Sequence, residues 1–188
     1  MDASFCIKAG ITDSYKEMGP GMVMRGIVGT VCLVTVVLAW PLLGHAGQKA
    51  DLVVVKKSES RLYLQRDGKP FASFEVVFGG KIEGHKKWKG DRRTPEGRYI
   101  LDAKNSKSNF YRAIRISYPN AQDRAAAKAL GVNPGGLVMI HGQKNGKGWL
   151  APVMQLFNWT DGCVALSNAD MDKVWEAVEV GTPIEIYP

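Results

Sequence analysis

The stretch Trp159-Thr160-Asp161-Gly162-Cys163-Val164-Ala165-Leu166 joins a polar turn, a single thiol and a short apolar run. Gly162 has no side chain, so the backbone can turn tightly directly before Cys163. A turn of this kind can direct the backbone N–H groups around Cys163 toward one point, which is the arrangement of an oxyanion hole. The stretch therefore predicts a cysteine nucleophile, with the backbone of Gly162 as part of the oxyanion hole.

A candidate base lies upstream of this stretch. From residue 47 onward the chain has two histidines, His85 and His141, and Cys163 follows His141 by 22 residues. A thiol attacks an acyl carbon best as the thiolate, and a nearby imidazole can accept its proton. His141 comes directly after the apolar run Leu137 to Ile140, and the end of a strand is a rigid support for a catalytic base. The spacing predicts His141 as the base for Cys163.

Short strands dominate the pattern around these residues. Strands are predicted at Leu52 to Lys56, Arg61 to Gln65, Phe71 to Phe78, Arg98 to Leu101, Tyr111 to Ser117, Leu137 to Ile140 and Pro183 to Tyr187. Helices are predicted at Ala121 to Leu130, before Gly131, and after a capping box at Ser167 to Asp170, with Met171, Val174, Trp175 and Val178 on the core face. The fold class is therefore mainly β, a sandwich or barrel with a few short helices.

The first 46 residues have a different composition. Arg25 precedes an apolar run from Gly26 to Leu43, and Gly44-His45-Ala46 supplies small residues near a cleavage point. This pattern predicts a leader with a signal peptide over residues 1–46, with Met22 or Met24 as an alternative start, and a catalytic domain over residues 47–188. The alternative is a membrane anchor, for which the run is about long enough at ~18 to 20 residues.

Cleavage of the leader would change the cysteine count and leave the charge unaltered. Cys6 and Cys32 would be removed, so Cys163 would be the lone thiol of an exported protein, where paired cysteines are usual. Residues 47–188 carry 22 Lys and Arg against 15 Asp and Glu, so the whole net charge of +7 lies there. For an exported protein, this charge favours an anionic wall polymer over nucleic acid as partner. The densest basic patch, His85 to Lys89, fits a solvated loop and a substrate-facing loop equally well.

Three segments resemble the L,D-transpeptidases, the YkuD-type family. They are Ile140-His141-Gly142, the stretch Trp159 to Leu166, and Gly90-Asp91-Arg92-Arg93-Thr94-Pro95-Glu96-Gly97-Arg98-Tyr99. A fourth segment, Phe110 to Arg124, is similar to the branch that contains a periplasmic murein-lipoprotein hydrolase. The resemblance extends over nearly all of residues 47–188.

The resemblance implies a β-sandwich domain and a cysteine thioester formed from a peptidoglycan stem peptide, at the bond between its diamino acid and D-Ala. It implies that Cys163 is the nucleophile, that His141 is the base and that the Gly142 carbonyl orients His141. Substrate contacts are expected from Arg93, Tyr111, Trp159 and Thr160, with no metal and no cofactor. The predicted leader implies an envelope or periplasmic location, with contact to the membrane only if the leader stays uncleaved. A monomer is the default expectation.

This chain departs from the family pattern at two positions and in one spacing. Asp161 stands where many members have His, and Ala165 where they have Arg, so recognition of a substrate carboxylate is open. The gap from His141 to Thr160 lies at or just beyond the long end of the usual range. Two alternatives to a transpeptidase remain: a hydrolase or amidase that releases a wall-linked lipoprotein or D-Ala, and a wall-binding protein without catalysis.

Overall fold

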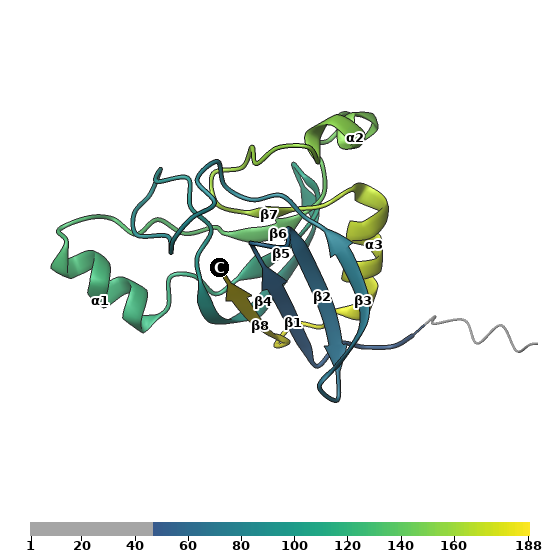
Figure 1. Cartoon of the computed structure of the whole chain (residues 1–188), viewed down its shortest axis with the longest axis horizontal. Helices are drawn as coiled ribbons and strands as arrows, with labels where there is room; N and C mark the ends of the chain where they lie inside the picture. The colour runs from purple at the N-terminus through teal and green to yellow at the C-terminus, as the bar shows by residue number, and fades with distance from the viewer. Residues whose placement is uncertain (1–46) are drawn as a thin grey trace, which may run out of the picture. The chain divides into compact units, whose positions relative to one another are not determined.

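The computed structural model describes residues 47–188, and the predicted leader lies outside these residues (Figure 1). In chain order the elements are β1 (Leu52–Lys56), β2 (Arg61–Arg66), β3 (Lys69–Glu75), β4 (Gly97–Ser108), β5 (Tyr111–Ile116), α1 (Ala121–Ala129), β6 (Met139–His141), the 3-10 turn η1 (Gly148–Leu150), α2 (Ala151–Met154), β7 (Val164–Ala165), α3 (Asn168–Ala177) and β8 (Pro183–Tyr187). The predicted class, mainly β with a few short helices, is confirmed.

The strands form one mixed sheet in the order β3-β2-β1-β8-β4-β5-β6-β7. The pairs β1–β8 and β6–β7 are parallel, and the remaining pairs are antiparallel. β4 is long enough to pair with β8 near its beginning and with β5 further along, so it connects the two halves of the sheet. Just beyond β3, Val77 exchanges two backbone hydrogen bonds with Ala165 of β7, so the ends of the sheet meet.

The core lies between the two halves of the curved sheet and α3. Alternating residues of the strands supply fully buried side chains, among them Leu62, Ile114, Ile140 and Ile184. α3 adds Met171, Val174 and Val178, and Trp175 packs partly buried against the same cluster, as the helical period predicts. Full burial of each large aliphatic side chain contributes roughly 1.5–3 kcal/mol, so this cluster is the main source of stability.

Local signals fix the ends of the helices. Asn120 and Asp123 form a reciprocal capping box at the beginning of α1, and Gly131 adopts φ 65° just after its end. At α3 the predicted capping box is only half formed. Ser167 Oγ accepts the Asp170 N–H at 3.1 Å, but it also donates to the Asp170 carboxylate at 2.8 Å, which uses the Asp170 side chain differently from a capping box.

Several parts of the chain differ from the sequence prediction. β6 comprises Met139–His141, two residues later than the predicted start, and β7 was not predicted as a strand. β4 runs on to Ser108 through the polar residues 104–107, because that stretch is held as a hairpin by pairing with β5. β3 ends at Glu75, because the next residues leave β2 to join β7. The segment of η1 and α2, between the predicted base and nucleophile, was not predicted.

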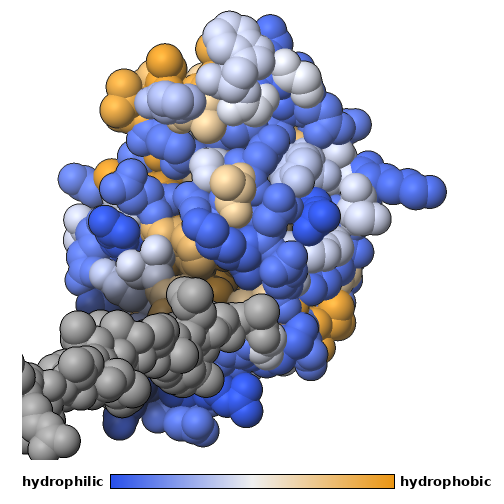
Figure 2. Space-filling view, turned by 90° about the vertical axis from the view of Figure 1, so that its right-hand side faces the viewer, coloured by the Kyte–Doolittle hydropathy of each residue, from blue (hydrophilic) through white to orange (hydrophobic). Residues whose placement is uncertain are grey.

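The surface is mainly hydrophilic on the side that carries β3 and α3 (Figure 2). Hydrophobic side chains on this face occur in small groups, one of them at the upper edge, the level of α2 in Figure 1. The exposed large apolar residues of the α2 region are Trp149, Val153, Leu156 and Phe157. None of the helices within residues 47–188 has the length and apolar character needed to cross a membrane.

Candidate active site

Cys163 lies at the end of a turn that leads directly into β7. Thr160 holds this turn: its Oγ1 accepts the Gly162 N–H at 3.1 Å and donates to the Cys163 carbonyl at 2.8 Å. Gly162 has φ +129°, and a Cβ there would lie 2.5 Å from the Arg93 carbonyl oxygen. The position therefore requires glycine, both for its backbone conformation and for the close approach of residue 93.

The Gly162 N–H is already bonded to Thr160, which bears on its predicted part in an oxyanion hole. Gly162 would have to release that bond to donate to an oxyanion. The neighbouring Cys163 N–H makes no hydrogen bond to any of residues 47–188. The Cys163 N–H is therefore available to an oxyanion, as is the Asp161 N–H, which also makes no hydrogen bond within residues 47–188.

His141 ends β6, the strand that runs parallel to β7. Its Nδ1 lies 2.6 Å from the Gly142 carbonyl oxygen. A carbonyl can only accept, so Nδ1 carries the proton and Nε2 is left as the basic nitrogen. The ring is buried between two aromatic side chains, with centroids 4.8 Å from Phe110 and 5.9 Å from Trp159. The imidazole is thus fixed in both its tautomer and its orientation.

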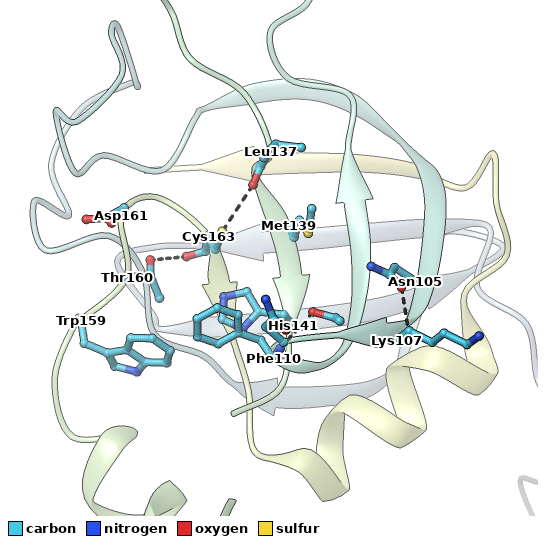
Figure 3. A pocket seen from close by; sticks show the side chains of 12 residues that line it. Asn105, Lys107, Phe110, Leu137, Met139, His141, Trp159, Thr160, Asp161 and Cys163 are labelled. Atoms are coloured by element: carbon cyan, nitrogen blue, oxygen red, sulfur yellow. Dashed lines mark hydrogen bonds between the residues drawn. The ribbon is translucent and has the colours of Figure 1, made fainter. Parts of the chain in front are cut away.

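Cys163 and His141 line the same cavity, which we call the aromatic cleft (Figure 3). It has a volume of about 650 Å³ and is lined by Asn105, Lys107, Ser108, Asn109, Phe110, Leu137, Met139, His141, Trp159, Thr160, Asp161 and Cys163. Cys163 Sγ lies 3.7 Å from the Leu137 carbonyl oxygen and makes no hydrogen bond to His141. Hydrogen bonds between catalytic residues are often long before substrate binds. The evidence that Cys163 and His141 can act together is therefore that both line one cleft.

Of the four predicted substrate contacts, the structure brings Trp159 and Thr160 into the cleft and leaves two elsewhere. Arg93 Nε donates to the Glu83 carbonyl oxygen at 3.0 Å. The Tyr111 hydroxyl donates to Asp172 at 3.0 Å. Neither side chain lines the aromatic cleft.

The hairpin between β4 and β5 forms a wall of the cleft that the sequence did not predict. Asn105 and residues 107–110 reach the cleft from this hairpin, and the Phe110 ring packs against His141 at a tilt of 46°. The one available signal was Phe110, at the beginning of the segment that resembles the lipoprotein-hydrolase branch. Its contact with His141 depends on a fold that brings together residues 31 positions apart.

Burial keeps the candidate nucleophile and base neutral at rest. Burial raises the pKa of the Cys163 thiol, against the smaller lowering effects of the Met139 backbone and Lys86, and Asp161 raises it further. Burial lowers the pKa of His141, and the Gly142 carbonyl opposes this effect. The resting pair is therefore a thiol and a neutral imidazole, and charge separation belongs to the reaction itself.

A second cavity borders Cys163, and we call it the lysine cavity. Its volume is about 290 Å³, and it is lined by Lys86, Lys89, Gly90, Gly135, Gly136, Leu137, Val138, Asp161, Gly162 and Cys163. Lys86 belongs to the predicted basic patch but is only 4% exposed, and its Nζ lies 2.8 Å from Asp91 Oδ1. The basic patch from His85 to Lys89 is thus not a wholly solvated loop, because Lys86 is buried in it. For the same reason it is not a loop whose side chains all face a substrate.

Asp161 does not hold the turn that carries Cys163. An Asp at this position could accept backbone N–H groups of its own turn, but Thr160 Oγ1 accepts the Gly162 N–H instead. Asp161 is exposed and points away from Cys163 (Figure 3). Within residues 47–188 no group of three or more His, Cys, Asp or Glu side chains is arranged to hold a metal ion.

Comparison with known proteins agrees with this geometry. Residues 50–186 match the family described as the L,D-transpeptidase catalytic domain, YkuD. The chain belongs to this family. Because the match extends from Ala50 to Ile186, it includes every strand of the sheet and both residues of the proposed pair.

Individual relatives are more distant. The chain is 32% identical over 114 residues to "Putative L,D-transpeptidase YafK" of Escherichia coli K12, covering 56% of this chain and 39% of that one. The helical cell shape determining protein Pgp2 of Campylobacter jejuni is 28% identical with a TM-score of 0.55, covering 72% of this chain and 46% of that one. Bd1075 of Bdellovibrio bacteriovorus, at 20% identity, TM-score 0.52 and coverage of 76% and 51%, shares the fold. The chain thus spans less than half the length of the first two relatives.

Proposed function

We propose that this protein is a peptidoglycan L,D-transpeptidase that acts through a thioester on Cys163. The observation that supports the proposal is the aromatic cleft, which both His141 and Cys163 line. The parallel strands β6 and β7 pair beside it, with Ala165, two residues after Cys163, opposite His141. The Gly142 carbonyl leaves His141 Nε2 as the basic nitrogen. Family membership supplies the substrate class, a stem peptide of the cell wall.

The first half-reaction forms the acyl-enzyme. His141 Nε2 accepts the thiol proton, and Cys163 Sγ attacks the carbonyl carbon of the diamino acid that precedes D-Ala. In this proposal the Cys163 N–H, which makes no hydrogen bond within residues 47–188, stabilises the oxyanion that forms. The C–N bond then breaks, the His141 imidazolium gives its proton to the leaving D-Ala nitrogen, and a thioester remains.

The second half-reaction regenerates the thiol. An amine of a second peptide attacks the thioester carbon, His141 takes a proton from that amine, and the C–S bond breaks. Sγ leaves as thiolate and recovers a proton from His141. A hydrolase would use water in place of the amine, so the acyl-enzyme is common to both reactions.

The deciding experiment mixes the purified protein with defined muropeptides and identifies the products by mass. A cross-linked or amine-exchanged product supports the transpeptidase, and a shortened stem with free D-Ala identifies a hydrolase. Cys163→Ala is the control that should give neither product. A wild-type protein that binds muropeptides without changing their mass would overturn the enzymatic proposal.

We further propose that the protein is exported to the cell envelope, where its substrate lies. The apolar run and the small residues before Gly47 support cleavage after Ala46. N-terminal sequencing of the envelope form should begin at Gly47. An uncleaved form that only detergent extracts would instead indicate an anchor.

A further inference from the structure

The ammonium group of Lys86 lies directly beside the turn that carries Cys163. Its Nζ is 3.5 Å from the point where a Cβ on Gly162 would stand. It donates to Asp91 Oδ1 at 2.8 Å and to the Trp88 carbonyl oxygen at 3.3 Å. A lysine ammonium has three N–H donors. One donor is therefore left without a partner among residues 47–188, in a group that borders the lysine cavity together with Cys163.

Asp91 fixes this ammonium in place. Its buried carboxylate also accepts the backbone N–H groups of Lys87 at 2.6 Å, Trp88 at 3.2 Å and Arg93 at 3.1 Å. Burial works to raise the pKa of Asp91, but the hydrogen bonds from Lys86 and the backbone outweigh it and the pKa is lowered. Asp91 is therefore ionised, and it organises the loop whose residue 93 carbonyl contacts Gly162.

Stability alone is a poor explanation for this pair. Desolvation of a buried ion pair offsets most of its attraction, and replacement of such pairs by apolar side chains is often neutral or stabilising. A buried pair that borders a candidate nucleophile is better explained by its effect on that nucleophile. Lys86 is the member of the pair that lines the lysine cavity with Cys163.

The other charged or titratable groups around Cys163 act differently. Asp161 is exposed, and its negative charge opposes formation of a thiolate. His141 is held neutral by burial. Lys89 is exposed at the lysine cavity, and Lys107 extends away from Cys163 at the hairpin side of the aromatic cleft (Figure 3). Lys86 is thus the buried cation beside the thiol.

We propose that Lys86 is a positioning residue for the reaction at Cys163, in which its buried ammonium, held by Asp91, stabilises the thiolate and the adjacent Gly162–Cys163 backbone. The inference rests on the proposed role of Cys163 as nucleophile. The thiol proton goes to His141, and Lys86 keeps its own proton throughout. Lys86 therefore contributes charge, and His141 contributes proton transfer.

The test measures the rate of Cys163 alkylation by iodoacetamide against pH in the full chain, without substrate. A nearby opposite charge lowers an acid's pKa, and the charge of Lys86 acts in this direction on Cys163. Lys86→Met should therefore slow alkylation near neutral pH about threefold or more, and the loss should disappear at alkaline pH, where both thiols are ionised. Because muropeptides are absent, the result does not depend on whether the protein turns them over.

Two further variants keep the test decisive. Lys86→Met with Asp91→Asn removes both charges and avoids an unpaired buried carboxylate, and it should show the same shift in pH profile. Lys89→Met removes an exposed cation from the same cavity, and its profile should stay within about twofold of wild type, because solvent screens that charge. A folded Lys86 variant with a wild-type pH profile would overturn the proposal, and so would a loss that persists at alkaline pH, which indicates a structural role alone.

Discussion

The two cavities that meet at Cys163 differ in how they treat charge. The aromatic cleft surrounds a neutral His141 with the rings of Phe110 and Trp159. The lysine cavity has the ion pair of Lys86 and Asp91 in its wall, supported by backbone N–H groups. A proton acceptor such as His141 must change its protonation state during the reaction. A group that stabilises charge, such as Lys86, must keep its proton. Separate parts of the chain meet these two requirements, and Cys163 lies between them.

Removal of the Cys163 thiol, which lines both cavities, should have the largest effect on activity. Cys163→Ala should abolish the covalent adduct that a carbapenem forms with the protein, because Cys163 is the sole cysteine of residues 47–188. Mass spectrometry of the treated variant and wild type measures the adduct directly. An adduct of equal yield on the variant would place the nucleophile elsewhere and remove the basis of the comparison.

Loss of the base on the aromatic side should come next. His141→Ala should reduce the rate of acylation by about two to four orders of magnitude, the usual contribution of general acid–base catalysis. Stopped-flow acylation over a range of pH provides the rate. A loss of rate no greater than that of Lys86→Met would contradict the assignment of proton transfer to His141 and of charge stabilisation to Lys86.

His141 in the aromatic cleft and Asp91, the partner of Lys86, should also affect the stability of the fold in different ranges of acidic pH. Burial lowers the pKa of His141 below the ordinary 6.5, so the unfolded chain takes up the proton first as pH falls. The folded state should therefore lose stability below about pH 6.5, by at most ~1.4 kcal/mol for each pH unit.

The pKa of Asp91 is lowered as well, but its effect on stability falls in a more acidic range. Its pKa is lowered from 3.8, so the stability it contributes should be lost only as pH falls below about 3.8.

The His141 range can be tested separately. Thermal melts between about pH 7.5 and 5.5 should show a steeper loss of stability for wild type than for His141→Gln. Parallel curves for the two proteins would contradict a buried, neutral His141.

The smallest effect is expected at Asp161, which borders both cavities. Its carboxylate is exposed and Thr160 holds the turn, so Asp161→Asn should keep acylation within about twofold of wild type. Removal of the negative charge should lower the pKa of Cys163 slightly, since Asp161 acts to raise it. The alkylation profile used for Lys86 detects this change. An Asp161→Asn variant as inactive as His141→Ala would assign the carboxylate to the catalytic machinery.

Local patterns predicted much of the fold. β8 has the predicted range, Pro183 to Tyr187, and the β1–β2 hairpin is confirmed. Apolar residues alternate along β2 and β8, and β1 is a continuous apolar run. The polar second half of β4 carries no such alternation. Its strand conformation comes from pairing with β5, which a local pattern does not contain.

The site was less predictable than the fold, for two physical reasons. Lysine is almost always solvent-exposed, so burial of Lys86 could be recognised only once Asp91 was seen to face it. Thr160 and Asp161 can both cap a turn through a side-chain oxygen, and three-dimensional geometry selects Thr160. The approach of Cys163 to His141 depends on the register of β6 and β7, in which Ala165, two residues after Cys163, lies opposite His141.

The bridge between Val77 and Ala165 has a consequence for how this architecture can vary. β7 is only two residues long, yet it is held by β6 on one side and by Val77 on the other. The segment from 144 to 158 leaves β6 and returns to this clamped strand, so its ends are fixed independently of its length. The entropy of loop closure grows only slowly with length. The segment is therefore a tolerant place for insertions, where accessory structure can be gained or lost while the nucleophile keeps its position.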